Sequence, residues 1–223
     1  MRYRRIPDET VRRLPLYLRG LLFLSEEGQQ SISSRDLADF LRVNPCQIRK
    51  DFSYFGDFGT PGVGYKVEKL AKQIKKILKL DVAHRTALVG VGNLGSAVLA
   101  YPGFRIYGLD IAAAFDTDPK KIGRKVNNIT IEDVSNLRTL RKRKINIAII
   151  AVPRDAAQGT ADALVKAGVK GILNFSPCYI TVPKKVKVIT IDIAMDLARL
   201  PYYMPSSQIS NVASTGSKQS ALA

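Results

Sequence analysis

The residues best suited to chemistry are three glycines in the middle of the chain. An apolar run at residues 86–89 leads directly into Gly90-x-Gly92-x-x-Gly95, and small and apolar residues follow at helical spacing. Strand, glycine-rich turn and helix in this order are typical of a dinucleotide-binding unit, whose phosphates rest on free N–H groups at the helix N-terminus. The alternatives are a turn that binds nothing and a site for another phosphate compound.

A carboxylate should follow at the end of the second strand. Asp116 ends the next apolar run, 21 residues after Gly95. Asp110 stands at the start of that run, which is the wrong end of a parallel strand, and Asp118 belongs to a turn with Pro119. We therefore assign Asp116 to the ribose hydroxyls of the adenosine. Its charge repels a 2′-phosphate, which favours NAD(H) over NADP(H).

No catalytic residue accompanies this cofactor motif. A dehydrogenase needs a proton donor or acceptor beside the nicotinamide, but the single histidine, His84, precedes the motif. Cys178 has no downstream histidine to activate it, and no Tyr-x-x-x-Lys pair follows the motif. Cys46 and Cys178 form no metal-ligand pattern. We predict a sensor of the cofactor without a metal site, and we keep an NAD-dependent oxidoreductase as the alternative.

The residues that precede the motif predict a helix-turn-helix. Residues 7–27 have helical periodicity, with a kink or restart expected at Pro15. Two short helices follow, at 33–41 with a capping box of Ser33 and Asp36, and at 45–55 with Pro45 in the first turn.

The second of these short helices has the properties of a recognition helix. Ile48, Phe52 and Phe55 cluster on one side and should face the core. The opposite side is short, polar and positive, as base and phosphate contacts require; the candidates on it and on its flanks are Gln47, Arg49, Lys50, Ser53 and Tyr54. An ordinary amphipathic helix with a solvated basic face is the alternative.

A glycine-rich segment after this helix predicts a wing. Residues 56–65 hold several glycines with interleaved aromatics, which suits a tight hairpin; a linker loop is the alternative. The predicted DNA contacts also include Ser34, Gly62 and Tyr65. An amphipathic helix at 66–80 closes the first domain, with a boundary near residues 81–84.

The remainder has an α/β rhythm that extends the dinucleotide unit into a Rossmann domain. Strands are expected at 127–131, 145–152, 169–175 and 186–191, and helices at 132–144, 156–167 and 193–204. Ligands bind at the carboxyl ends of such strands, so Val152, Pro153, Asn174 and Phe175 should line the nicotinamide end; simple turns at the strand ends are the alternative. The full set of cofactor candidates from the motifs is Gly90, Val91, Gly92, Asn93, Leu94, Gly95, Asp116, Val152, Pro153, Asn174 and Phe175.

Composition supports a polyanion partner without locating its site. The 223 residues carry a net charge of +16, of which residues 1–84 hold +6 and residues 85–223 hold +10. No apolar run reaches the roughly 18 residues of a membrane span, and no hydrophobic region follows the basic N-terminus as in a secretory signal. Together with the two cysteines, this predicts a cytoplasmic protein without a membrane partner.

The joint order of these motifs resembles the Rex family of redox-sensing transcriptional repressors. The matching segments are Gln47-Ile48-Arg49-Lys50-Asp51-Phe52-Ser53-Tyr54-Phe55-Gly56, Gly59-x-x-Gly62-Val63-Gly64-Tyr65, the residues from Gly90 to Gly95, Ala114-Phe115-Asp116-x-Asp118-Pro119, Val152-Pro153-Arg154-Asp155-Ala156-Ala157-Gln158 and Gly171-Ile172-Leu173-Asn174-Phe175-Ser176-Pro177. The resemblance as a whole covers the chain from the first helix to about Met204.

The resemblance implies a homodimer of winged helices and Rossmann domains that binds palindromic operator DNA and is released by NADH. It implies that the helix of residues 192–206 is swapped into the partner, with a mobile tail at 207–223. It also implies that Tyr101 and Asp192 lie near the nicotinamide, and that Arg19 pairs with Asp192 in one state only. Pro61 departs from the basic residue often found at the wing tip of the family. A CoA-binding module is a further alternative, because related Rossmann domains bind CoA.

Overall fold

The computed structural model describes residues 6–60 and 62–204, which fall into two compact units. Pro61 and the tail beyond residue 204, on which two of the expectations above rest, lie outside this description. Unit 1 comprises Met1–His84 and Pro102–Asp110, and unit 2 comprises Arg85–Tyr101 and Ile111–Ala223. The sequence-based boundaries place the segment Pro102–Asp110 in the second domain, but its Tyr107 packs against the core of unit 1.

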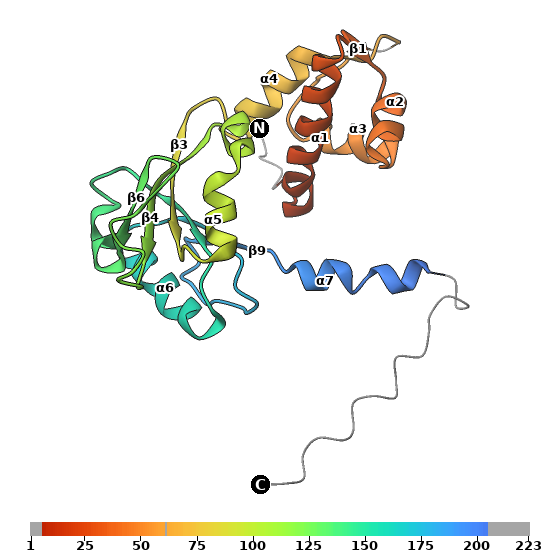
Figure 1. Cartoon of the computed structure of the whole chain (residues 1–223). Helices are drawn as coiled ribbons and strands as arrows, with labels where there is room; N and C mark the ends of the chain where they lie inside the picture. Colours follow the sequence, from red (N-terminus) through yellow and green to blue (C-terminus); the bar gives the residue numbers. More distant parts are fainter. Residues whose placement is uncertain (1–5, 61, 205–223) are drawn as a thin grey trace, which may run out of the picture. The chain divides into compact units, whose positions relative to one another are not determined.

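Unit 1 is a helical domain with a small two-stranded sheet (Figure 1). Its elements are α1 (Asp8–Glu26), β1 (Ser31–Ile32), α2 (Ser34–Leu41), α3 (Pro45–Ser53), β2 (Tyr65–Lys66), α4 (Val67–Ile77) and the 3₁₀ helix η1 (Pro102–Tyr107). α1 packs on α4, and α2 packs on α3. β1 and β2 pair antiparallel, Ile32 opposite Tyr65. The domain therefore contains the helix-turn-helix that the sequence predicts, together with a short sheet whose first strand, before α2, was not predicted.

The helix α1 runs through Pro15 without ending there, so the expected restart is wrong. Pro15 lies on the exposed side, where its missing N–H costs one hydrogen bond. Its neighbours Leu14, Tyr17 and Leu18 are fully buried. Because most helical stability comes from packing of the apolar face, these contacts keep the helix continuous.

The caps of the two short helices follow the sequence. The Ser33 hydroxyl accepts a 3.0 Å hydrogen bond from the backbone N–H of Asp36 and donates to its carboxylate at 2.7 Å. The Asn44 side chain accepts from the N–H of Cys46, and Pro45 occupies the first turn of α3. Ile48 and Phe52 are buried and Phe55 packs against the same core, which confirms the predicted inward face.

Unit 2 is a doubly wound sheet in the strand order β5-β6-β4-β3-β7-β8-β9. The strands are β3 (His84–Val89), β4 (Leu109–Asp116), β5 (Lys125–Val126), β6 (Ile129–Asp133), β7 (Ile147–Ile150), β8 (Gly171–Asn174) and β9 (Lys187–Thr190), and the main helices are α5 (Asn93–Ala100) and α6 (Arg154–Lys166). Without the short antiparallel β5, this order is the 3-2-1-4-5-6 of a Rossmann fold. Its switch point lies between β3 and β7, which pair parallel.

The local predictions in unit 2 are only partly correct. The strand expected at 127–131 is present as β6, which pairs parallel with β4, but it begins at Ile129. Asn127 and Asn128, at φ of 48° and 64°, form the turn of a hairpin between β5 and β6; asparagine tolerates this conformation. The basic helix expected at 132–144 is only the 3₁₀ helix η2 (Val134–Thr139). The final helix, expected at 193–204, divides into α7 (Ile193–Leu197) and the 3₁₀ helix η3 (Leu200–Tyr203). Pro201 is the second residue of η3.

The described ranges contain no helix long and apolar enough to cross a membrane. They also contain no group of three or more His, Cys, Asp or Glu side chains arranged to hold a metal ion.

Candidate DNA-reading and cofactor sites

The exposed face of α3 meets the wing in a groove of unit 1. A pocket of about 480 Å³ is lined by residues of the α2 start, the α3 face and the segment that follows α3, among them Ser34, Arg49, Ser53, Gly62 and Tyr65. The fold therefore brings together five of the predicted DNA contacts from separate segments. Lys50 is exposed on the same helix but does not line the groove.

Arg49 is held in place across this groove. Its guanidinium donates to the Ser34 hydroxyl at 3.0 Å and to the Cys46 sulfur at 3.1 Å. The first contact ties α3 to the first residue of α2. The guanidinium remains exposed, so its other N–H groups are directed at solvent. A positioned, solvated arginine is suited to phosphate or guanine contacts.

The wing is a short hairpin that leans on β1. Thr60 and Gly64 exchange two backbone hydrogen bonds of 3.0 Å. Gly64 has φ of +87°, and a Cβ there would overlap the carbonyl oxygen of Ile32, so only glycine fits. Gly62 is exposed, also with positive φ.

Two predicted DNA contacts are placed differently from the expectation. Tyr65 is buried, with its ring edge-on to Phe52 at 5.3 Å, and burial raises the pKa of its hydroxyl. Its ring is thus part of the core rather than of the free surface. Gln47 is half-buried, and its amide nitrogen donates to Asp51 at 2.9 Å. Helical periodicity gives only the direction of a side chain around the helix axis. It does not reveal that Gln47 forms a hydrogen bond with Asp51 one turn later.

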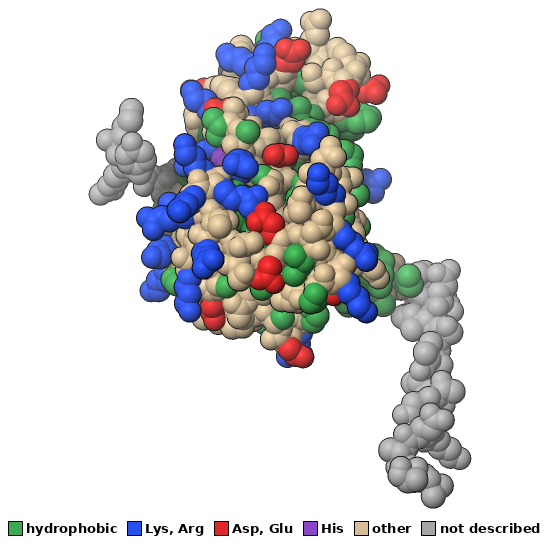
Figure 2. Space-filling view, turned by 60° about the vertical axis from the view of Figure 1, so that its left-hand side comes forward, with side chains coloured by type: hydrophobic (Ala, Val, Ile, Leu, Met, Phe, Trp, Pro, Cys, Tyr) green, Lys and Arg blue, Asp and Glu red, His purple; other side chains and the backbone are tan. Residues whose placement is uncertain are grey.

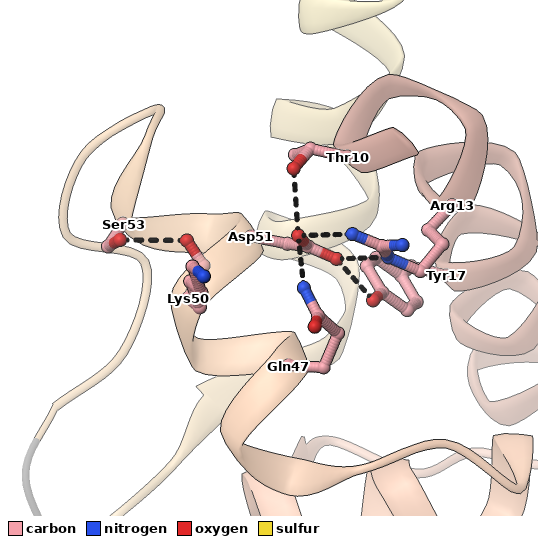
Figure 3. A network of polar contacts seen from close by, with 7 residues as sticks. All are labelled: Thr10, Arg13, Tyr17, Gln47, Lys50, Asp51 and Ser53. Atoms are coloured by element: carbon pink, nitrogen blue, oxygen red, sulfur yellow. Dashed lines mark hydrogen bonds and ion pairs between the residues drawn. The ribbon is translucent and has the colours of Figure 1, made fainter. Parts of the chain in front are cut away.

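Asp51 is the centre of a buried polar network that sequence reasoning missed (Figure 3). Its carboxylate has no exposed surface and accepts five hydrogen bonds. Arg13 donates twice, at 2.7 and 2.9 Å, and Tyr17 donates at 2.6 Å. Thr10 and Gln47 donate at 2.9 Å each. Burial alone would raise the pKa of Asp51, but the hydrogen bonds, led by Arg13, hold that pKa down at about 2.

This network joins α1 to α3 through charge in addition to apolar packing, in which Tyr17 also contacts the ring of Phe52. Thr10, Arg13 and Tyr17 lie on α1, whereas Gln47 and Asp51 lie on α3. The sequence signal was the spacing of Thr10, Arg13 and Tyr17 at helical intervals, together with an acidic residue on the inward side of α3. The orientation of the predicted recognition helix therefore depends on side chains that are themselves buried.

In unit 2, the glycine-rich turn after β3 forms a close-packed cradle. Gly90 has φ of +93°, and a Cβ there would overlap the carbonyl oxygen of Ala151 after β7. A Cβ at Gly95 would overlap the carbonyl oxygen of Gly90. Gly92 differs, because its backbone is extended and a Cβ would meet nothing within 4 Å. Packing explains the first and third glycines, whereas the second, at the N-cap of α5, leaves open space in which a ligand can approach the backbone.

Asp116 ends β4 beside this cradle. It is 7% exposed. One carboxylate oxygen accepts from the N–H of Val91 at 2.7 Å and from the Lys121 ammonium at 3.1 Å, and the other accepts from the N–H of Asp118 at 2.9 Å. Burial raises its pKa, but these donors outweigh burial and hold the pKa of Asp116 below its ordinary value. A carboxylate offers about four acceptor positions, so one remains for a ribose hydroxyl while Lys121 stays bound.

Asn174, predicted to lie at the nicotinamide end, is held by hydrogen bonds within the turns that follow the strands. It has no exposed surface, and its amide nitrogen donates to the backbone oxygens of Ser176 and Cys178. Its oxygen accepts from the N–H of Ser176, whose hydroxyl donates to the carbonyl of Val152 at 2.7 Å. These bonds join the turns after β7 and β8, next to Pro153, which is exposed, and Phe175, which is half-buried.

The remaining predicted residues lie apart along the chain. In the cradle, Asn93 and Leu94 are exposed at the start of α5, and Tyr101 is exposed at its C-terminus. Asp192 caps α7 by accepting from the N–H groups of Ala194 and Met195, and lines a pocket of about 850 Å³ with residues that follow β8 and β9. In unit 1, Tyr54 is half-buried and Arg19 is exposed on α1.

An exposed basic helix beside a wing, in a chain that also has a glycine-rich cradle typical of dinucleotide binding, indicates a transcription regulator with a nucleotide-sensing domain. Two family models match: one described as "Putative DNA-binding protein N-terminus" at residues 5–53, and one described as "CoA binding domain" at residues 81–178. The two together match both units.

Full-length relatives identify the family. The redox-sensing transcriptional repressor Rex of Chloroflexus aurantiacus is 47% identical over 203 residues, 91% of this chain and 96% of that protein. Rex of Lactobacillus gasseri is 44% identical over 208 residues, 93% and 97% of the two chains. The chain therefore belongs to the Rex family of redox-sensing transcriptional repressors. It is a transcriptional repressor and not an enzyme.

Solved structures agree with this assignment. A Rex-family repressor, RSP, in complex with β-NAD⁺ and operator DNA has a TM-score of 0.84 and 37% identity, covering 90% of this chain and 93% of RSP. RSP in complex with β-NADH has a TM-score of 0.82 and 36% identity, with coverage of 89% and 93%.

Proposed function

We propose that this chain binds palindromic operator DNA as a homodimer, and that NADH releases it. The observation that carries the proposal is the glycine cradle beside Asp116. Gly92 leaves open space where a diphosphate must approach, at the N-terminus of α5. The dinucleotides bound to RSP are the chemistry that fits such a cradle.

The adenosine end favours NAD(H). Asp116 is buried and ionised at neutral pH, and it offers one free acceptor position to a ribose hydroxyl. A 2′-phosphate at this place would meet the carboxylate. Lys121 neutralises part of that charge from 3.1 Å away, so the preference depends on the balance of these two side chains.

The sign of the response follows from the charge of the nicotinamide ring. A neutral reduced ring enters a dry apolar interface at lower cost than the cationic oxidised ring. NADH then shifts the equilibrium towards a closed arrangement of the dimer only because it binds that arrangement more tightly. The recognition helices would be displaced from the spacing that two half-sites fix.

The C-terminal segment supplies the argument for a dimer. Every residue from 193 to 204 is exposed, including large apolar side chains such as Leu197 at 63% and Tyr202 at 87%. Such an apolar segment needs a covering surface, and a swap into a second copy provides it. Within this dimer, Tyr101 and Asp192 would lie near the nicotinamide, and Asp192 would pair with Arg19 in one state.

The test measures DNA release. The full chain is titrated against a labelled duplex from its own upstream region by fluorescence anisotropy at fixed salt, and NADH, NAD⁺ and CoA are then added separately. Release by NADH at concentrations where NAD⁺ has no effect supports the proposal. Release by CoA alone would instead favour the CoA-binding function that one family model suggests, and binding indifferent to all three would remove the switch.

Variants assign the two sites. Arg49→Ala should lose operator affinity and keep NADH binding. Asp116→Ala should lose NADH affinity and keep operator affinity. Unchanged NADH affinity in Asp116→Ala would contradict the ribose assignment, and unchanged operator affinity in Arg49→Ala would contradict the recognition-helix assignment.

A further inference from the structure

Three separate segments of unit 2 bring cations to the amino-terminal edge of the sheet. Lys144 precedes β7, Lys170 precedes β8 and Lys185 precedes β9. The three strands are adjacent and parallel, so their starts share one edge, opposite the edge that holds the cofactor cradle. Backbone hydrogen bonds join the segments, from the N–H of Lys170 to Asn146 and from the N–H of Lys187 to Lys170.

The edge is hollowed by a pocket of about 740 Å³. Five of its lining residues are Lys or Arg, and none is Asp or Glu; the five are Arg141, Lys144, Lys166, Lys170 and Lys185. The buried side chains of Ile145, Val169 and Val186 also line it. Figure 2 shows that blue side chains are more widespread than red ones across one whole face of the molecule.

These cations are not neutralised within the described part of the chain. Lys144, Lys170 and Lys185 are exposed, and none has a carboxylate within ion-pair distance among residues 6–60 and 62–204. Arg143, in the same segment, does have one, since it pairs with Glu132 at 2.6 Å. The C-terminal dipole of α6 accounts for Lys166 in its last turn, but not for the others. Such crowding of like charge is relieved by an anionic partner.

We propose that this amino-terminal edge binds the phosphate backbone of duplex DNA outside the recognised half-site. The cations continue beyond the pocket to Arg138, Lys142 and Lys184, all exposed, and the pocket has no aromatic lining on which a nucleobase could stack. Both features suit an extended polyanion better than a single nucleotide. Three strands at about 4.8 Å spacing cover about 10 Å, over which a duplex carries about six phosphate charges.

The experiment compares the full chain with the variant Lys144→Gln/Lys170→Gln/Lys185→Gln. The control is Lys120→Gln/Arg124→Gln/Lys125→Gln, which removes three exposed cations near β5 at the other border of the sheet. Anisotropy titrations at several salt concentrations use a minimal operator duplex, the same operator with long flanks, and a duplex without an operator.

The proposal predicts weaker binding of the edge variant to DNA outside the operator. Affinity for the operator-free duplex should fall about tenfold or more at low salt, and the slope of log affinity against log salt should shrink by about 2 to 3. The minimal operator and its release by NADH should be unchanged. If the edge variant also loses affinity for the flanked operator, the contact lies on the same duplex as the operator. If it loses affinity only for the operator-free duplex, the contact lies on a second duplex. Either result supports DNA binding.

Three outcomes would overturn the proposal. The first is that the edge and control variants bind every duplex alike. The second is ATP binding that the edge variant loses while its DNA binding stays intact, because the pocket would then serve a free nucleotide. The third is competition by poly-glutamate as effective as by DNA of equal charge, because the edge would then serve an acidic protein. A failure of NADH-dependent release leaves each of these readouts interpretable.

Discussion

Replacing Asp51 by asparagine should disconnect the recognition helix from α1. The carboxylate accepts five hydrogen bonds without exposed surface, whereas an asparagine amide replaces one acceptor oxygen by a donor. That nitrogen would face groups that all donate to the carboxylate, so at least one of the present hydrogen bonds must be lost or reversed. The charge of Arg13 would also lose its partner.

The magnitude follows from the pKa of Asp51. Its ordinary value is 3.8 and the folded value is about 2, so ionisation alone contributes about 2 to 3 kcal/mol of stability. Removal of one partner of a buried ion pair typically costs about 3 to 5 kcal/mol. We expect Asp51→Asn to lower the free energy of unfolding of unit 1 by an amount in that range at pH 7.

The pH dependence provides a second, independent signature. Because folding depresses the pKa of Asp51, its stabilisation is complete above pH 3.8 and is lost as the pH falls towards 2. The stability difference between the wild type and Asp51→Asn should therefore be constant from pH 7 to about pH 5 and should narrow below pH 4. Urea unfolding followed by circular dichroism at each pH measures this difference.

DNA and cofactor binding separate this role from a general loss of folding. Under conditions where the variant remains folded, its operator affinity should fall about tenfold, since α3 must be reoriented on binding, and NADH affinity in unit 2 should not change. Asp39→Asn, at an exposed carboxylate of α2, is the matched control. The reasoning is refuted if Asp51→Asn is destabilised by less than about 1 kcal/mol and binds the operator as this control does.

Four further predictions concern unit 2. Gly92→Ala should fold as the wild type does but lose about tenfold or more in NADH affinity, measured by NADH fluorescence and thermal melting, because its Cβ would occupy only the space left for a ligand. Gly95→Ala should lower the melting temperature as well, because its Cβ would overlap the carbonyl of Gly90. NADH affinity should be flat between pH 8 and 5 as far as Asp116 controls it, because its lowered pKa keeps it ionised there; calorimetric titration of wild type and Asp116→Asn tests this. Leu197→Lys should shift the chain from dimer to monomer in sedimentation velocity, because it charges an apolar segment that a second copy would cover.

The sequence predicted the two units because their signals are local. The glycine motif, the alternation of strands and helices and the caps at Ser33 and Pro45 depend on residues within a few positions of one another. The signal for the β5–β6 turn was present too, since adjacent asparagines tolerate the left-handed conformation of Asn127 and Asn128. The failure at Pro15 has a different origin, because tertiary packing of α1 outweighs the local preference of one residue.

The features that escaped prediction depend on contacts between distant segments. Asp51 receives its partners from 34 to 41 residues upstream and from Gln47 one turn earlier. An ionised carboxylate requires the amide nitrogen of Gln47 to face it, so one of the two amide hydrogens is used within the protein and the orientation of the amide group is fixed. The second amide hydrogen and the amide oxygen are the groups that remain for a base edge. What the recognition helix reads is therefore set partly by α1, which lies behind it in the core.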